Sequence, residues 1–450
     1  MGRVRDLRAE SRWRQMGLPF PSTIMRTIWL SPLLCSFVLV AQEETAKKAP
    51  EPKATKAEPK KFTEFPVPEA APLDVEAASK QAIAAMLALQ EGEDGDPWPY
   101  EGVYREDRKG REDPGQLPVG YRVGGTAIAC LGLIATPGYR GDEARKAAVE
   151  RGLEFVLATL DAPRMQIEFI GTYDVRGWGH IYALQLLLML EDRGLVPGSV
   201  KEVPAKTKWL VKALVESAIP QSGGWNYSRG SGYLSPNNKA STFMTAPALQ
   251  ALFHAKARGH TVPDEVVTQA LDALERSRAK PGGYAYGAPA ESQADVEEEK
   301  LSMMDKTPSS AARAVACETT LLLAGRGDQK RLETAIDRFF AHWDDLAVRK
   351  SQPFTHVKPY GIAPYYFMFG HVYCAQGIEQ LASAEKRELL RAKLRAVLAL
   401  SREEDGSWND RQFGRSGGYG TAFALLTLHM PSLPKPVPWA SGAVTPGASK

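Results

Sequence analysis

The chain of 450 residues has little cysteine and little histidine, four residues of the first and seven of the second. The cysteines lie far apart and form no Cys-x-x-Cys pair, which excludes a disulfide framework. Cys35 belongs to an apolar N-terminal run, and the other three fall inside apolar segments. We therefore expect Cys130, Cys317 and Cys374 to be buried free thiols.

Net charge is also nearly absent. The sequence has 56 basic and 53 acidic residues, so its formal net charge is only +3. The basic residues are scattered, and their densest run, Lys47–Lys61, lies in a segment of low complexity. Nucleic-acid binding needs a clustered basic surface, so we expect no nucleic-acid partner.

Several catalytic and metal-binding signatures are missing. The sequence has no Gly-x-Ser-x-Gly elbow, no phosphate-binding loop, no His-Glu-x-x-His helix and no EF-hand loop. These absences leave no motif-based argument for a nucleotide, a catalytic serine or a metal ion. We predict no metal site and no cofactor.

The one long apolar run near the N-terminus is Ile28–Ala41. It is too short for a comfortable membrane span, but it suits the core of an export signal cleaved after Ala41. The first 24 residues include five arginines and show no fold signal, so Met25 is an alternative start. We expect an exported protein, periplasmic or secreted, that touches a membrane only through this signal or through an uncleaved anchor.

Composition divides the rest of the chain. Residues 42–72 are rich in Ala, Lys, Glu and Pro, which predicts a disordered linker. Residues 432–450 are rich in Pro, Gly and Ser, which predicts a flexible tail. The prediction is an N-terminal extension and signal at 1–41, the linker at 42–72, one folded domain at 73–431 and the tail at 432–450.

The domain repeats one unit six times. In the last copy, the amphipathic helix Ala384–Arg402 leads through a Gly/aromatic loop into the apolar helix Thr421–Leu428. The first helix has one apolar stripe, and the second is apolar or small nearly all round. Six exposed helices that alternate with six buried ones predict two concentric rings, an all-α (α/α)6 toroid.

The loops carry the family resemblance. Gln221–Trp225, Pro281–Tyr284 and Asp405–Trp408 each place glycine beside an aromatic residue before a small-residue helix. Glycine permits positive φ, and the ring can cover the end of a helix pair, so we interpret these rings as structural staples. Over about Leu73–Pro431 the pattern resembles the prenyltransferase and squalene-cyclase (terpenoid cyclase) repeat superfamily, whose members are six-fold α/α toroids.

The chemistry of that superfamily is not implied, because its motifs are missing. The Asp-x-Asp-Asp acid of the cyclases has no counterpart, and Asp344-Asp345 comes nearest. The Asp-x-Cys zinc pair of the protein prenyltransferases is also absent, since Val315 stands two places before Cys317. Our leading hypothesis is an exported toroid whose central cavity binds a small molecule, isoprenoid-like or saccharide, or another protein.

Polar residues on or beside the buried helices are the candidate catalytic groups, because a buried polar group without a partner costs about 1–3 kcal/mol. Asp174, His180 and Glu318 could form an acid/base set if they face one cleft, which would suit a polysaccharide lyase or hydrolase. Glu318 alone could serve an isoprenoid-processing enzyme with an atypical acid. The structural alternatives are a loop-fixing cluster and a carboxylate paired with arginine.

Four further residues are candidates for ligand binding. Tyr366 and His371 lie on an apolar helix with an aromatic face, where His371 could equally be a core histidine. Arg122 precedes the first buried helix, at the expected mouth of the ring. Trp225 belongs to the loop aromatics.

Overall fold

The computed structural model describes residues 73–91, 97–100, 117–169, 175–227, 239–280, 282–350, 352, 354–411 and 414–441. The chain divides into two units, Met1–Pro59 and Lys60–Lys450, and every described residue belongs to the second. The predicted export signal, the linker and the last nine residues of the predicted tail lie outside the described ranges. Within these ranges, no helix combines the length and the apolar character needed to cross a membrane.

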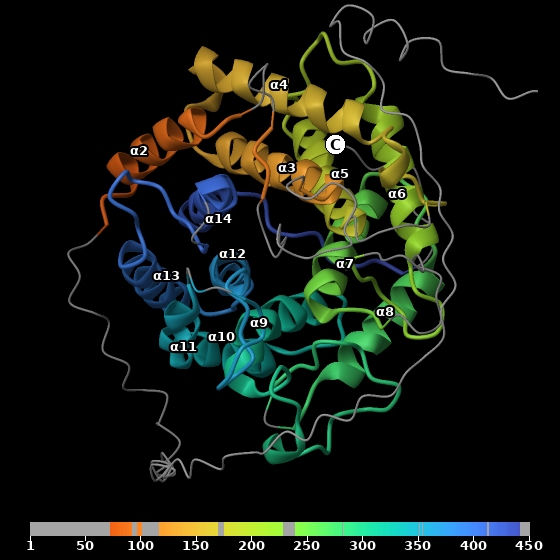
Figure 1. Ribbon diagram of the computed structural model, residues 1–450. Helices are drawn as coiled ribbons and strands as arrows, with labels where there is room; N and C mark the ends of the chain where they lie inside the picture. Colours follow the sequence, from red (N-terminus) through yellow and green to blue (C-terminus); the bar gives the residue numbers. More distant parts are fainter. Residues whose placement is uncertain are drawn as a thin grey trace, which may run out of the picture. The chain divides into compact units, whose positions relative to one another are not determined.

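Six helices form a closed inner ring (Figure 1). They are α3 (Val119–Ala135), α5 (Arg176–Asp192), α7 (Thr242–Ala257), α9 (Thr307–Leu323), α12 (Tyr366–Glu379) and α14 (Gly417–His429). Each contacts the next along the chain, and α14 contacts α3, which closes the ring. Small and apolar residues let these helices be buried on every side; in α14 every residue from Gly417 to Leu428 is buried.

Six helices form the outer ring. They are α2 (Val75–Ala88), α4 (Glu143–Thr159), α6 (Val203–Ser217), α8 (Asp264–Ser277), α10 (Gln329–Ala341) and α13 (Ala384–Ala399). A short helix, α11 (Trp343–Arg349), follows α10, and His342 separates the two helices. In the described ranges the remaining elements are short 3-10 turns and isolated bridges, and the predicted all-α toroid is confirmed.

One joint recurs between outer and inner helices. Trp98, Trp225 and Trp408 are buried in equivalent places. Each indole N–H donates over 2.7–2.9 Å to a carbonyl near the end of the outer helix, that of Met86, Leu214 or Leu398. Each tryptophan backbone N–H donates over 2.9–3.1 Å to a hydroxyl of the inner helix, that of Thr126, Thr245 or Thr421. The rings act as staples between the two layers, as predicted.

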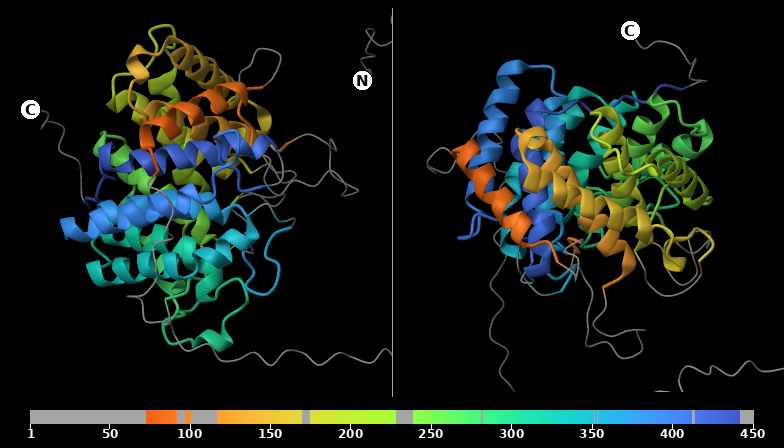
Figure 2. Two further views of the ribbon diagram at one scale, coloured as in Figure 1. Left: turned by 90° about the vertical axis from the view of Figure 1, so that its left-hand side faces the viewer. Right: turned by 90° about the horizontal axis from the view of Figure 1, so that it is seen from above.

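The first and last repeats meet. Helices α2 and α14 lie side by side (Figure 2), and Ser79 shares a hydrogen bond of 2.8 Å with His429. Helix α3 approaches α14 so closely that a Cβ at Gly132 would lie 2.7 Å from the Cα of Ala422. Because the ring closes on itself, the first and last repeats cover each other's apolar faces, and no capping repeat is needed.

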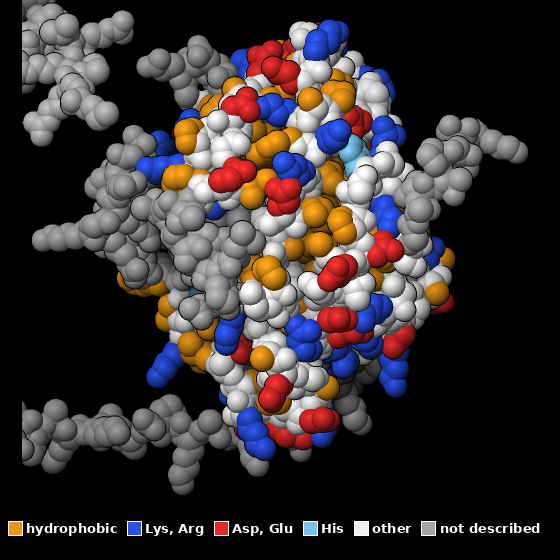
Figure 3. Space-filling model, turned by 90° about the vertical axis from the view of Figure 1, so that its right-hand side faces the viewer, with side chains coloured by type: hydrophobic (Ala, Val, Ile, Leu, Met, Phe, Trp, Pro, Cys, Tyr) orange, Lys and Arg blue, Asp and Glu red, His pale blue; other side chains and the backbone are white. Residues whose placement is uncertain are grey.

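The cysteines and the surface charges are as the sequence predicts. Cys130, Cys317 and Cys374 are free and buried, as predicted. On the face drawn in Figure 3, acidic and basic side chains are interspersed, and neither sign gathers into one large patch. That face has no concentrated positive charge of the kind that binds nucleic acid.

Candidate functional site

The starts of five inner helices surround a cavity of about 180 Å³, which we call the aromatic pocket. Helices α3, α5, α7 and α14 contribute one ring each, those of Tyr121, Trp178, Phe243 and Tyr419, and Tyr365, the N-cap of α12, adds a fifth. Loop residues complete the wall: Tyr100, Tyr227, Tyr286, Thr355 and His356. Eight aromatic rings therefore line a cavity on the axis of the toroid.

The loop tyrosines owe their position to the staples. Each follows a buried ring by two residues, in the pairs Trp98/Tyr100, Trp225/Tyr227 and Tyr284/Tyr286. Trp98 and Trp225 are staples, and the backbone N–H of Tyr284 donates to the hydroxyl of Ser310 over 3.0 Å. Successive side chains of an extended chain point to opposite sides, so two residues that are two positions apart point to the same side, one further along the segment than the other. One ring of each pair fills the joint and the next reaches the pocket. In the sixth repeat the equivalent residue is Asp410, two places after Trp408.

Asp410 is a buried carboxyl group directly behind the pocket wall. The hydroxyl of Tyr100 donates to its Oδ2 in a long hydrogen bond of 3.5 Å, and Nε of Arg411 donates to the Tyr100 oxygen over 3.3 Å. Among the described residues, Oδ1 has no hydrogen-bond partner. Burial raises the pKa of Asp410 to about 7, against the opposing charge of Arg411. Both protonation states are populated near neutral pH, which suits proton transfer.

His356 enters the pocket as a neutral imidazole. Its Nδ1 lies 2.9 Å from the carbonyl oxygen of Gly361 and donates to it, so Nε2 is an acceptor for the Tyr365 hydroxyl at 3.2 Å. Burial lowers the pKa of His356 to about 4, and nearby arginines act in the same direction. The pocket therefore contains an uncharged acceptor with a fixed tautomer.

Backbone strain collects around this pocket. In the described ranges, the non-glycine residues with positive φ are Val175, Phe354 and His356, at 58°, 65° and 53°. Val175 precedes α5 three residues before Trp178, and the other two flank Thr355. Such conformations cost about 1–3 kcal/mol each, and they persist where the surroundings enforce them. Strained residues of this kind concentrate at binding sites.

The electrostatic environment of the pocket is positive. Five helix N-termini, the positive ends of the helix dipoles, surround it. The buried Arg411 lies 5.6 Å from the ring of Tyr365, and the buried Arg313 lies 5.5 Å from the ring of Tyr286. A cationic ligand would meet rings that already interact with guanidinium groups. The arrangement favours an uncharged or anionic ligand.

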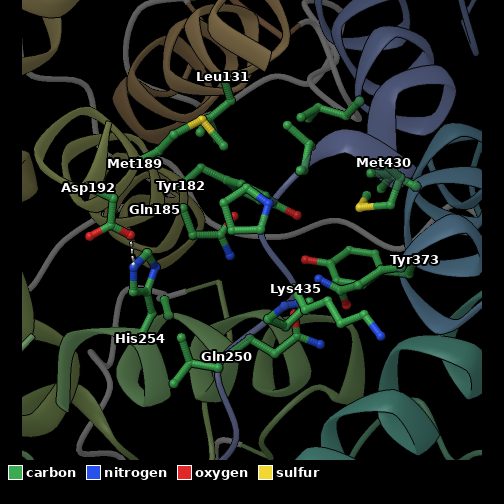
Figure 4. A pocket seen from close by; sticks show the side chains of 18 of the residues that line it. Leu131, Tyr182, Gln185, Met189, Asp192, Gln250, His254, Tyr373, Met430 and Lys435 are labelled. Atoms are coloured by element: carbon green, nitrogen blue, oxygen red, sulfur yellow. Dashed lines mark hydrogen bonds and ion pairs between the residues drawn. The ribbon is translucent and has the colours of Figure 1, made fainter. Parts of the chain in front are cut away.

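A second cavity of about 200 Å³ lies at the opposite ends of the same five inner helices (Figure 4). We call it the tail-side pocket, because residues 433–437 of the C-terminal segment form part of its wall. Rings packed at steep angles connect the two pockets: the ring centroid of Trp178 lies 5.2 Å from that of Tyr182, and the centroid of Tyr419 lies 4.6 Å from that of Phe423. The first ring of each pair lines the aromatic pocket and the second lines the tail-side pocket.

The predicted histidines lie between the two helix layers, outside both pockets. His180 donates from Nε2 to the carbonyl of Met165 over 2.8 Å and packs edge-on against Trp209 of α6. His371 donates from Nδ1 to Phe367 over 2.7 Å and accepts from the indole of Trp343 over 2.9 Å. Burial lowers the pKa of each histidine to about 4.

Glu318 joins three helices. Its carboxylate pairs with Arg278 at the end of α8 over 2.8 Å and with Arg331 of α10 over 2.9 Å. His180 and Glu318 therefore have separate partners and share no pocket. Asp174 lies outside the described residues. Among the residues described, the expected acid/base set does not come together.

The predicted ligand-binding residues also have structural neighbours. Tyr366 lies behind the pocket lining, 5.5 Å from Phe243 and 4.9 Å from the guanidinium of Arg313. Arg122 is exposed, and its guanidinium lies 5.0 Å from the ring of Phe155 on α4. Trp225 occupies the repeated joint. None of these side chains lines either described pocket.

Sequence reasoning missed the residues that do line the aromatic pocket. It assigned the loop aromatics to the joints as one group, although only the first ring of each pair is stapled. The two-residue spacing was visible in Trp98-Pro99-Tyr100 and in Trp225-Asn226-Tyr227. Aligning the repeats on the tryptophan would also have singled out Asp410 as the one acidic residue at this position.

Comparisons with known proteins support the fold. The chain is similar to unsaturated glucuronyl hydrolase from Streptococcus agalactiae, with a TM-score of 0.51 and 14% identity over 80% of this chain and 93% of that chain. A type II terpene cyclase, MstE from Scytonema, gives a TM-score of 0.46 and 15% identity over 80% of this chain and 98% of that chain. The GH76A alpha-1,6-mannanase from Salegentibacter sp. HEL1_6 gives a TM-score of 0.47 and 13% identity over 80% of this chain and 99% of that chain.

The match to the glucuronyl hydrolase agrees with the α/α toroid fold that the helices of this chain form. No protein-family model and no curated protein sequence matches the chain. Identities this low show the architecture alone. The function has to be argued from the pockets.

Proposed function

We propose that this toroid binds a small organic ligand in the aromatic pocket, and that the part inserted there is one uncharged or anionic ring, such as a saccharide ring. The observation that carries the proposal is the lining itself: eight aromatic rings, six of them tyrosines, together with the hydroxyl of Thr355 and the neutral imidazole of His356, on the axis of the toroid. Apolar walls with a few fixed polar groups are typical of small-molecule sites.

The size of the pocket restricts the ligand. A cavity of about 150 Å³ holds benzene, and the aromatic pocket measures about 180 Å³. The described walls therefore enclose one six-membered ring and leave its substituents toward the mouth. A folded polyene chain would not be enclosed, which favours a saccharide over an isoprenoid.

Hydrogen bonding points the same way. Burial raises the pKa values of Tyr365 and Tyr419 well above the usual range, so their hydroxyls stay protonated. The hydroxyl of Thr355 and the imidazole of His356 add further polar contacts in the wall. A ring that bears hydroxyl groups can form hydrogen bonds with the oxygen atoms of these side chains, whereas a hydrocarbon forms none.

Two enzymatic alternatives are less well supported. A lyase or hydrolase built on Asp174, His180 and Glu318 lacks a shared cleft among its described members. An isoprenoid enzyme that uses Glu318 as its acid would have to break two ion pairs first. If the pocket does support catalysis, the acid within reach is Asp410, through Tyr100. We retain export through residues 1–41 as part of the proposal.

A pocket-filling variant tests this function. Thr355 is only half-buried, so Thr355→Tyr should fill the cavity without disturbing the core. Thr261→Tyr, on an exposed loop, is the matched control. The thermal unfolding midpoint of the chain would be measured against a panel of glycosides, uronic acids, isoprenoid alcohols and quaternary ammonium salts.

The expected result is stabilisation of the wild type and of Thr261→Tyr by at least one glycoside or uronic acid, and loss of that stabilisation in Thr355→Tyr. Stabilisation by isoprenoid alcohols alone, or a glycoside effect that survives Thr355→Tyr, would rule out the proposed ligand at this pocket.

A further inference from the structure

We infer that the tail-side pocket is a second ligand site, which takes an uncharged molecule with a short apolar body and one hydrogen-bonding head group. The inference does not rest on the ligand proposed for the aromatic pocket. It rests on the lining of the cavity, on the charges around it and on the chain segment that crosses its mouth.

Residues 433–439, which we call the strap, cross the C-terminal ends of the inner helices (Figure 2). Trp439 anchors the strap by donating its backbone N–H to the carbonyl of Leu323 over 2.9 Å. Its ring lies 5.2 Å from Phe253 of α7, and the ammonium of Lys256 lies 4.2 Å from that ring. The strap is thus fixed at its far end, and Leu433–Val437 forms one wall of the cavity.

The inner wall of the cavity is apolar. Leu131 of α3, Val372 of α12, and Phe423 and Leu426 of α14 line it, together with the methionines Met189 and Met430. Methionine side chains adapt to ligands of irregular shape. Such a wall provides the binding energy for a short hydrocarbon chain, at about 25 cal/mol for each Å² removed from water.

A set of uncharged polar groups gathers on one part of the wall. Gln250 donates its amide N–H to Thr320 over 3.0 Å, which holds its side chain in place. Gln185, Tyr182 and Tyr373 lie nearby in the lining (Figure 4). Burial raises the pKa values of both tyrosines, so their hydroxyls remain neutral donors. Amide and hydroxyl groups can both donate to and accept from one ligand head group.

Charges oppose ionic ligands of either sign. Five helix C-termini, the negative ends of the dipoles, face the cavity and disfavour an anion. Arg193 and Lys435 line it and disfavour a cation. At the rim, Asp192 is already paired with His254 over 2.5 Å and with Arg258 over 3.2 Å. The ligand that meets no such penalty is uncharged.

Volume sets the size of the molecule. A cavity of about 150 Å³ holds the six carbon atoms of benzene, and the tail-side pocket measures about 200 Å³. About eight non-hydrogen atoms fit by the same ratio. A six-carbon alcohol matches this size and chemistry, and it serves as the probe.

The experiment compares three probes that differ only in head-group charge: 1-hexanol, hexanoate and hexylammonium. Binding to the full chain would be measured by ligand-observed NMR titration at pH 7. We expect 1-hexanol to bind about tenfold tighter than either ion. Leu426→Trp, which fills the cavity, should weaken hexanol binding about tenfold or more, while Leu389→Trp on the exposed side of α13 should leave it unchanged.

Two further variants keep the inference falsifiable if Leu426→Trp fails to fold. Trp439→Ala removes the anchor of the strap, and hexanol should then dissociate several-fold faster. Thr355→Tyr fills the other pocket and should not affect hexanol binding. Equal affinity for all three probes, or loss of hexanol binding in Thr355→Tyr, would overturn the inference while leaving the proposal for the aromatic pocket to its own test.

Discussion

At the residue scale, Glu318 shows how a buried carboxylate can hold a fold together. It is 3% exposed and pairs with Arg278 and Arg331, which come from two outer helices. In Glu318→Gln both guanidinium groups lose their counter-charge. A broken buried ion pair usually lowers the free energy of unfolding by about 3–5 kcal/mol. Because the two arginines are partly exposed, we expect a smaller decrease here, of about 2–3 kcal/mol.

Urea unfolding of the variant checks that value. The matched control is Glu388→Gln, whose exposed carboxylate pairs with Arg391 on the surface of α13 and should cost less than about 1 kcal/mol. If Glu318→Gln proves as stable as the control, the carboxylate is not a structural brace, and a functional role would have to be reconsidered.

The titration of Asp410 gives a second prediction at this scale. Burial raises its pKa from the ordinary value of about 4 for an aspartate to about 7. The folded chain binds the proton of Asp410 more tightly than the unfolded chain does. The resulting contribution to the free energy of unfolding is fully present below the pKa of the unfolded chain and is lost as the pH rises through 7. Asp410→Asn removes this loss. Relative to the wild type, the variant should gain about 2–3 kcal/mol between pH 5 and pH 8.

The measurement is the free energy of unfolding of both proteins at several pH values. The comparison with Asp161→Asn, a mostly exposed carboxylate paired with Lys206, separates burial from net charge. Stability curves for wild type and Asp410→Asn that run parallel from pH 5 to pH 8 would show that Asp410 is not held in a raised-pKa state.

At the element scale, the joints between outer and inner helices matter most. The hydroxyl of Thr421 accepts the backbone N–H of Trp408 over 3.0 Å inside the core. Thr421→Val keeps the shape of the side chain but leaves that N–H without a partner. We expect destabilisation of about 1–3 kcal/mol.

The control for this joint is Thr334→Val on α10, whose hydroxyl only bonds back to Lys330 of its own helix. Its effect should stay within about 0.5 kcal/mol. Equal effects of the two substitutions in thermal unfolding would mean that the repeated hydroxyl contributes nothing to the joint.

These elements were predictable from sequence because periodicity records which face of a helix is buried. The stripe of Leu390, Leu394, Val397 and Leu398 on α13 is buried as expected. The site was less predictable, because polar residues on the inner helices can point outward as well as inward. His180 and Glu318 turn toward the outer ring, and linear spacing contains no information on that direction.

At the scale of the whole molecule, the closed ring should make unfolding cooperative. Helix α2 covers the joint between the last and first repeats, and Met86 accepts the indole N–H of Trp98. A chain that begins at Glu91 lacks α2 and should unfold at a lower urea concentration with a shallower transition. A chain that begins at Leu73 keeps the ring and should unfold like the full chain.

Circular dichroism and tryptophan fluorescence would follow the two truncations. Coincident, steep transitions in the chain that begins at Glu91 would show that the inner ring, which α3 and α14 still close, unfolds cooperatively without α2. That result would contradict the role of α2 at the joint between the last and first repeats.

The central claim is that the aromatic pocket selects an uncharged or anionic ring and rejects a cationic one. Calorimetric titration of the full chain with methyl glucoside, glucuronate and protonated glucosamine tests it most directly, since the three differ mainly in charge. We predict that the glucoside or the glucuronate binds about tenfold tighter than glucosamine, and that Thr355→Tyr abolishes this binding. Tighter binding of glucosamine than of both others would contradict the account.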